Sequence, residues 1–275
     1  MSITTNSDRL LRIRRDTLKT MLVGHPLDCP ICDKAGECLL QDLVHEHGIT
    51  EVESKAPISK FTSAYTTTFI KSWPQRCVLC LRCVTACNEI QGIGALTVVE
   101  QPEGKRISYD RDKCVSCGEC IQVCPVGALT EKKTGNRWRS WETTRIRTTC
   151  PYCGVGCQQS LHIKGGKIVR VSGVEDAEPN QGRLCVKGRY GFDFIYSEER
   201  LKTPLIKENG QFREASWDEA LDLVANKFKK IIAESGPDAI AGVSCARSIN
   251  EDSYQMQKLF RAVIKTNNID HCART

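Results

Sequence analysis

Aromatic side chains are scarce in this 275-residue chain, at 6% of its residues, and hydrophobic residues reach only 40%. This is little apolar material for one large core. Small domains with thin cores commonly depend on bound metal, whose binding free energy becomes folding free energy. No apolar run approaches the roughly 20 residues of a membrane span, and no secretory signal precedes a small-residue cleavage site. The sequence therefore predicts several small units, no membrane span and a cytoplasmic location.

A strong net charge is also missing. The formal value is +6, but it counts every cysteine as a neutral thiol. Fifteen metal-bound thiolates, offset by roughly +2 from each of four oxidised cluster cores, would bring the total to about −1. No basic run is interleaved with aromatic residues either. The composition thus argues against nucleic-acid binding.

Cysteine, by contrast, is abundant, with 17 residues. A secreted disulfide framework and metal ligation in a reducing compartment are the two common explanations. Fifteen of the cysteines, together with one histidine, fall into four runs with the spacing of iron–sulfur ligands. The runs are His25/Cys29/Cys32/Cys38, Cys77/Cys80/Cys83/Cys87, Cys114/Cys117/Cys120/Cys124 and Cys150/Cys153/Cys157/Cys185. Four clusters along one chain predict a path for electrons.

The two middle runs repeat one pattern, C-x2-C-x2-C-x3-C, and Pro125 follows the second copy. In two-cluster ferredoxins the fourth cysteine of each run ligates the other cluster. Zinc favours pairs of C-x2-C separated by longer spacers, so it fits this pattern poorly. The predicted ligand sets are therefore Cys77/Cys80/Cys83/Cys124, called set one below, and Cys87/Cys114/Cys117/Cys120, called set two.

The two outer runs are less specific. The H-x3-C-x2-C-x5-C spacing from His25 to Cys38 suits zinc and an iron–sulfur cluster equally well. An imidazole ligand would leave a cluster less negative and so raise its potential. The run from Cys150 to Cys185 favours a cluster, because three closely spaced ligands are unusual for zinc. We call these the histidine set and the terminal set.

Hydrophobic periodicity and turn residues predict the secondary structure. Hairpins are expected at Pro102–Gly104 and at Gly165-Gly166, and residues 51–68 are a polar linker. Strand and helix alternate over the last 60 residues, which predicts the beginning of an α/β domain. Helices are expected over residues 7–23, 35–47, 217–235 after a Ser216 cap, and from Asn250 to about 266, with a strand over 239–244.

Long motifs carry a family resemblance. HPLDCPICDKAGEC resembles the cluster motif of one histidine and three cysteines shared by the large electron-input subunit of respiratory complex I, iron-only hydrogenases and NAD-linked formate dehydrogenases. CPYCGVGC and RLCVKGRYG resemble the iron–sulfur entry domain of molybdopterin oxidoreductases. SCARSINEDSYQMQKLFRAVIKTNNIDHCART is similar to formate dehydrogenase catalytic subunits. An iron-only hydrogenase would follow the repeat with its own catalytic-cluster domain, and a complex I subunit usually lacks the intact eight-cysteine repeat. The chain therefore resembles the formate dehydrogenase alpha subunit best.

The resemblance implies an α+β multidomain fold. Its parts are a small helical segment with a cluster ligated by histidine and cysteine, a two-cluster ferredoxin-like βαβ domain, a small β-rich [4Fe-4S] domain and the start of an α/β molybdopterin-binding domain. The expected bounds are 1–50, a linker over 51–69, 70–135, 143–200 and 201–275.

The resemblance also implies cofactors and partners. Four [4Fe-4S] clusters and a Mo- or W-bis(molybdopterin guanine dinucleotide) would oxidise formate to CO2 and release electrons singly. The expected acceptors are diaphorase-type NAD/FMN iron–sulfur subunits, a hydrogenase or a ferredoxin.

Individual residues inherit roles from the same resemblance. Lys187 would lie between the terminal cluster and the pterin, although without the motif it would be interpreted as a surface lysine. The pterin would be approached by Arg247, Ser248 and Asn250, of which Asn250 is equally explained as a helix cap. Cys245 is interpreted as a small buried hydrophobic residue, and Cys272 has no assigned role.

The family's catalytic cysteine or selenocysteine is expected directly after Thr275, where the chain stops, so no catalytic residue is assigned. The chain is therefore expected to have no formate dehydrogenase activity by itself. Met1 to Thr5 resembles the segment that follows a plant-type [2Fe-2S] domain in longer relatives, and no C-x4-C-x2-C run precedes it here, so either this family member lacks that domain or the start has been placed too late. The competing hypotheses are a stand-alone electron-transfer subunit that ends at Thr275 and a zinc-stabilised interaction module.

The codon after Thr275 separates these hypotheses. Because selenocysteine is encoded by UGA, we expect UGA at this position, followed by an open frame that resumes with histidine. Sequencing of the genomic DNA checks this. A UAA or UAG codon with no homologous frame beyond it would favour the stand-alone subunit instead.

Overall fold

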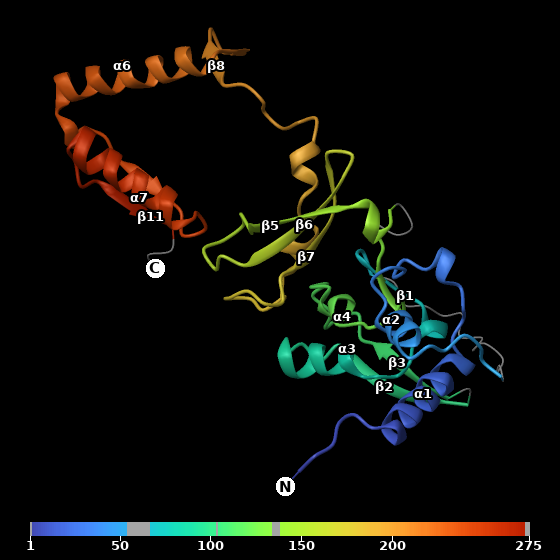
Figure 1. Cartoon of the computed structure of the whole chain (residues 1–275). Helices are drawn as coiled ribbons and strands as arrows, with labels where there is room; N and C mark the ends of the chain where they lie inside the picture. Colours follow the sequence, from blue (N-terminus) through green and yellow to red (C-terminus); the bar gives the residue numbers. More distant parts are fainter. Residues whose placement is uncertain (1, 54–66, 103, 134–137, 273–275) are drawn as a thin grey trace. The chain divides into compact units, whose positions relative to one another are not determined.

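The chain is described by a computed structural model over residues 2–53, 67–102, 104–133 and 138–272 (Figure 1). It divides into two compact units. The first comprises Met1–Thr148 with Cys157–Tyr190, and the second comprises Thr149–Gly156 with Gly191–Thr275.

Two helices open the first unit, α1 (Asp8–Val23) and α2 (Leu39–Glu46). The Ser7 hydroxyl accepts a hydrogen bond from the Leu10 N–H and caps α1, while Gly24 ends it, so the helix predicted over 7–23 is confirmed. The buried Leu18, Leu22 and Leu40 place the facing sides of the two helices in one core.

The second helix is shorter than the sequence predicts. It begins at Leu39 rather than at residue 35, because Gly36 adopts a φ of +83° and Cys38 is extended. Backbone in these conformations cannot continue an α-helix. The residues before α2 instead form turns and a short 3-10 helix, Cys29–Ile31, which carry three of the four ligands of the histidine set.

A ferredoxin-like block follows. Strand β1 (Ile70–Ser72) pairs antiparallel with β4 (Leu129–Glu131), and β2 (Leu96–Gln101) pairs with β3 (Gly104–Tyr109). The Gln101–Gly104 register confirms the hairpin predicted there. Two short helices have equivalent places in the repeat, α3 (Arg82–Thr85) and α4 (Glu119–Gln122). A π-helical turn, Ala86–Ile90, extends α3, and a 3-10 turn, Pro74–Arg76, follows β1.

The remainder of the first unit is a small three-stranded sheet, ordered β5-β6-β7, and one short helix (Figure 1). Strand β6 (Gln158–Lys164) pairs with β7 (Lys167–Gly173) around Gly165-Gly166, as predicted. Strand β5 (Thr144–Thr149) follows a 3-10 turn, Ser140–Glu142, and helix α5 (Val186–Tyr190) begins directly after Cys185.

Ion pairs join the three parts of this unit. The guanidinium of Arg170, on β7, contacts Glu37 at 2.7 Å and Glu131 at 3.2 Å. Glu37 precedes α2 and Glu131 ends β4, so one nearly buried arginine holds three segments that are distant in sequence. Charge-assisted bonds of this kind fix geometry where little apolar core is available.

The second unit contains a hairpin of β8 (Leu205–Glu208) and β9 (Gln211–Glu214), and the long helix α6 (Trp217–Ser235). The Ser216 hydroxyl accepts the Glu219 N–H at 3.1 Å, which confirms the predicted cap. Strand β10 (Gly242–Ser244) then pairs in parallel with β11 (Ile269–His271). Helix α7 (Asn250–Lys258) and a π-helical turn, Leu259–Ile264, connect them, which is the predicted start of an α/β domain. A 3-10 turn, Asp193–Tyr196, also belongs here.

Two predictions for this unit were wrong in detail. The strand expected over 239–244 begins at Gly242, because Gly236-Pro237 ends α6 in a 3-10 turn, Pro237–Ala239. Asn250 is the first helical residue of α7 and not its cap. Ile249 holds the cap position, with no side-chain hydrogen bond.

Most of the linker predicted over 51–68 lies outside the described residues. Within the described ranges, no helix has both the length and the apolar character needed to cross a bilayer.

The end of β7 supplies a stability test. A Cβ on Gly173 would overlap the backbone carbonyl of Gly182, which cannot move as a flexible side chain could. We expect Gly173→Ala to cost about 1–3 kcal/mol by overpacking and to lower the thermal unfolding midpoint of the iron-loaded protein. Gly24→Ala is the control, since no atom lies within 4 Å of its added methyl group. Equal midpoints for the two variants would contradict the packing described at Gly173.

Candidate metal centres

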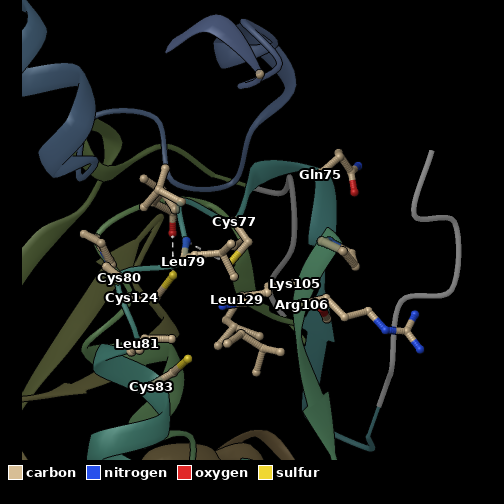
Figure 2. Close-up of a pocket in the computed structure, with 18 residues that line it drawn as sticks. Gln75, Cys77, Leu79, Cys80, Leu81, Cys83, Lys105, Arg106, Cys124 and Leu129 are labelled. Atoms are coloured by element: carbon tan, nitrogen blue, oxygen red, sulfur yellow. Dashed lines mark hydrogen bonds between the residues drawn. The ribbon is translucent and has the colours of Figure 1, made fainter. Parts of the chain in front are cut away.

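One cavity of about 210 Å³ is lined by all four cysteines of predicted set one (Figure 2). Cys77, Cys80 and Cys83 come from the first repeat and Cys124 from the second. Val126 and Leu129 are among the apolar residues that complete the wall. The fold thus brings the distant fourth cysteine to the first three, as the crossed pairing requires.

A second, smaller cavity of about 30 Å³ is lined by the cysteines of predicted set two. Here Cys87 comes from the first repeat and joins Cys114, Cys117 and Cys120 from the second. Its other walls are largely apolar, with Ile70, Ile93 and Leu96 among them. The two repeats therefore exchange one cysteine each.

The backbone of the two repeats has the same conformation between the cysteines. Leu79 and Leu81 in the first repeat, and Ser116 and Gly118 in the second, all have positive φ, between 53° and 77°. The Leu79 N–H donates to the Cys77 sulfur, and the Ser116 N–H donates to the Cys114 sulfur, both at 3.4 Å. Alternation of right- and left-handed residues turns successive N–H groups into a concavity that binds anions, including iron–sulfur clusters. The residues present fit such a cluster.

Burial dominates the acid–base chemistry of these thiols. It raises the pKa of Cys83 to about 12 and that of Cys120 well above its usual range, with neighbouring cysteines adding to both shifts. The pKa of Cys77 is raised for the same reason. Metal binding must therefore displace protons from these sites, since only the thiolate is a ligand.

The histidine set lies in the turns between α1 and α2. Burial lowers the pKa of His25 and keeps the imidazole neutral, as a metal ligand must be. Its Nδ1 atom is buried and makes no hydrogen bond. Burial also raises the pKa values of Cys32 and Cys38, and Cys32 and Cys29 raise that of Cys38 further. These three thiols are thus neighbours, and the buried imidazole nitrogen, which makes no hydrogen bond, fits the role of a metal ligand.

The loop of the histidine set is braced by two arginines. Arg76, only 2% exposed, pairs with Asp28 at 2.5 Å and lies over the Trp73 ring. The guanidinium of Arg139 donates to the carbonyl oxygens of Pro30 and Cys32. The absence of a side chain at Gly127 lets the Cys32 sulfur approach the ferredoxin-like block, because a Cβ there would overlap it.

The terminal set is divided between the two units. Cys150 and Cys153 belong to the second unit, whereas Cys157 and Cys185 belong to the first. Its four-ligand assignment stays a prediction. Lys187, on α5 two residues beyond Cys185, is exposed.

The second unit has its own cavity, of about 960 Å³, next to the ends of β10 and β11. Ser248 and Asn250 line it, whereas Arg247 is exposed beside it. Its other hydrogen-bonding groups are Ser244, Ser253, Gln257, Arg261, Asp270 and His271. The polar lining and the size fit a nucleotide-like ligand such as a pterin dinucleotide.

Cys245 was predicted to be a buried hydrophobic residue, and this is wrong in part. It is half-buried, and its sulfur lies 3.5 Å from that of Cys272. The parallel register of β10 and β11, which pairs Ser244 with His271, brings the two thiols together.

None of the 17 cysteines is joined to another by a disulfide bond. Over the described ranges, no three His, Cys, Asp or Glu side chains meet the geometry of a site for a single metal ion.

The structure also places a buried side chain beside set two that the sequence did not single out. Arg189, on α5, is 1% exposed and its guanidinium donates to the Cys117 carbonyl at 2.9 Å. It makes further bonds to Gln122 at 3.0 Å and to Glu119 at 3.3 Å. Arg189 lies in the RLCVKGRYG motif, but no residue pattern in that motif indicates that its side chain is buried against a segment 70 residues away in sequence.

The crossed pairing makes a testable prediction about iron content. Cys124→Ser should abolish the same cluster as Cys80→Ser, although the two residues belong to different repeats. Cys87→Ser should abolish the same cluster as Cys117→Ser. Each variant should lose about four irons, measured by iron analysis and by EPR after anaerobic reduction. The Cys272→Ser variant is the control and should keep its iron. Loss of one signal by Cys124→Ser and of another by Cys80→Ser would contradict the pairing.

Models of known families match four consecutive segments of the chain. Residues 14–53 match the NADH-ubiquinone oxidoreductase-G iron-sulfur binding region, and residues 76–128 match the 4Fe-4S dicluster domain. Residues 143–197 match the molybdopterin oxidoreductase Fe4S4 domain, and residues 200–275 match the molybdopterin oxidoreductase family.

Several curated relatives align along the whole chain. The NADPH-Fe(3+) oxidoreductase subunit alpha of Geobacter sulfurreducens is 40% identical, and a G-type NADH-quinone oxidoreductase subunit of Rhizobium meliloti is 38% identical. A Staphylococcus aureus protein whose name assigns it provisionally to the formate dehydrogenases is 31% identical. All three alignments cover 100% of this chain but 32% of the relative, so the chain spans about a third of their length.

A crystal structure of an NAD+-reducing [NiFe]-hydrogenase in the H2-reduced state is 28% identical, with a TM-score of 0.44. The match covers 49% of this chain and 60% of that one. The chain thus contains four consecutive segments, one similar to an NADH-G-type iron–sulfur binding region, one to a 4Fe-4S dicluster domain and two to molybdopterin oxidoreductase domains.

Proposed function

We propose that the chain is the iron–sulfur electron-transfer portion of a formate dehydrogenase catalytic subunit. The single observation that carries the electron-transfer proposal is the pair of cavities, each lined by four cysteines drawn from both repeats. The formate assignment rests on the motif resemblance of residues 244–275 and on the Staphylococcus aureus relative.

The ligand sets would hold four [4Fe-4S] clusters, which accept and donate single electrons when bound. A Mo- or W-bis(molybdopterin guanine dinucleotide) would be held partly by the second unit. Ser248 and Asn250 supply hydrogen-bonding groups to its cavity, with Arg247 beside it, and Lys187 follows the last ligand of the terminal set.

Contacts within the first unit support one order of the ligand sets. Helix α5 follows Cys185 of the terminal set. Its Arg189 donates to the Cys185 carbonyl through the backbone N–H and to the carbonyl of Cys117 in set two through the side chain. Burial raises the pKa of Cys120 in set two, and the charges of Cys117 and then of Cys83 raise it further. Because Cys83 belongs to set one, the two sets are neighbours. The order begins with the terminal set, followed by set two and then set one.

The histidine set comes last in this order. The Leu39 N–H, next to Cys38, donates to the Pro125 carbonyl, next to Cys124, at 2.9 Å. Burial lowers the pKa of Lys34, and the negative charges of Glu37, Cys124 and Cys38 oppose this shift. The Lys34 ammonium therefore lies near the sulfurs of Cys124 in set one and Cys38 in the histidine set. Set one and the histidine set are thus adjacent, and electrons would leave toward an NAD-linked partner, a hydrogenase or a ferredoxin from this end.

A second candidate function is a complex I-like electron-transfer subunit. The 38% identity to the G-type NADH-quinone oxidoreductase subunit along the whole chain, and the NADH-G match of residues 14–53, favour it as strongly as the motifs favour formate. The two candidates share the ligand sets and differ in the donor of the electrons.

The test uses the complete protein purified anaerobically with its partner subunits. Formate should reduce its clusters, which would be observed as new EPR signals. Reduction of the same protein with dithionite should produce the same signals. The chain of residues 1–275 with reconstituted clusters should contain about sixteen irons, respond to dithionite and not respond to formate.

The other outcomes identify the alternatives. Reduction by NADH or NADPH but not by formate would replace the formate proposal with the complex I-like function. A colourless protein that contains zinc and no iron would support the zinc-stabilised interaction module and remove electron transfer altogether.

A further inference from the structure

Arg189 and Arg76 are two arginines of the first unit whose side chains are almost completely buried. Each lies beside a different predicted ligand set. Arg76 pairs with Asp28, in the loop of the histidine set, and Arg189 donates to the carbonyl of Cys117 in set two. Burying a guanidinium costs free energy, so a buried arginine is expected beside groups that its positive charge stabilises.

The surroundings of Arg189 hold it in one place. Its three nitrogens donate to Cys117, Gln122 and Glu119, as described above. Gly118 makes room for it, because a Cβ there would overlap the arginine side chain and the Tyr190 hydroxyl. Tyr190 in turn stacks on Phe69, with ring centroids 4.5 Å apart and planes inclined by 5°.

The same residue reaches the terminal set through its own backbone. The Arg189 N–H donates to the Cys185 carbonyl at 3.1 Å, within the turn that opens α5. A continuous chain of covalent and hydrogen bonds therefore runs from Cys185 through Arg189 to Cys117. One residue thus connects a ligand of the terminal set to a ligand of set two.

We propose that Arg189 is a positioning residue for set two, which anchors the helix after Cys185 on this set and raises the reduction potential of the cluster held there with a buried positive charge. The inference rests on the proposed electron-transfer function, because it presupposes that a cluster is bound.

The physical reason is the charge of the reduced state. Reduction adds one negative charge to a cluster, and net charge and solvent exposure are among the factors that set its potential. A fixed cation in a site with little water stabilises that added charge more than a solvated cation could. Arg189 is fully desolvated, whereas the side chain of Glu119 is 6% exposed.

The Glu119 carboxylate opposes Arg189, since it lies 3.3 Å from one nitrogen of the guanidinium. The guanidinium also donates to the Cys117 carbonyl at 2.9 Å, so the positive charge of the pair directly contacts a residue of set two.

The experiment is an EPR-monitored redox titration of the complete protein with its clusters, at mildly alkaline pH. The set-two signal is identified by its loss in Cys117→Ser. Arg189→Gln should lower the midpoint potential of this signal by about 59 mV or more, a tenfold change in the one-electron equilibrium. Glu119→Gln should raise it, because it removes a negative charge and leaves the arginine. The midpoint potential of the double variant should lie between those of the two single variants.

Matched variants separate charge from folding. Arg189→Lys keeps the charge and should restore most of the potential, so it remains informative where Arg189→Gln folds poorly. Arg12→Gln should leave the set-two signal unchanged, since that arginine is exposed on α1.

Two results would overturn the inference. Shifts of the same sign in Arg189→Gln and Glu119→Gln, or no shift with the signal intact, would show that the buried charge does not set the potential. A wild-type protein without any reducible iron–sulfur signal would remove the proposed function itself, and the inference with it.

Discussion

The exchange of one cysteine between the two repeats is the constraint on which the first unit depends. Neither cavity is complete without a cysteine from the other repeat, because Cys124 lies with Cys77, Cys80 and Cys83, and Cys87 lies with the second group. The crossing forces α3 and α4 together and brings β4 back beside β1. A chain with so few aromatic residues gains a defined interior by this means, since bound metal would supply much of the folding free energy.

Buried cations join this interior to the segments around it. Arg170 links the loop before α2 to the end of β4, Arg76 fixes the turn that precedes Cys29, and Arg189 holds α5 against α4. Each lies close to a predicted ligand set or to the segment that carries one. The arginines therefore have two physical consequences: they satisfy buried acidic groups and carbonyl oxygens, and they place positive charge where a reduced cluster would be stabilised.

The second unit has a different physical character. Its parallel β10–β11 pair and α7 form one βαβ element, and a polar cavity lies at the ends of these strands. Ligands of open α/β sheets bind at the carboxyl ends of the strands, so this location agrees with the molybdopterin oxidoreductase match over residues 200–275.

Local patterns in the sequence determined much of this protein. The cysteine spacing fixed which residues line each cavity of the ferredoxin-like block, because the doubled motif admits one crossed pairing, and caps and glycine pairs located α1, α6 and the β6–β7 hairpin. Only the tertiary structure decided that Arg189 and Arg76 are buried, that Cys245 meets Cys272, and that α2 starts four residues late at Leu39. Those features depend on contacts between residues tens of positions apart or on a left-handed Gly36, and no periodicity along the chain encodes them.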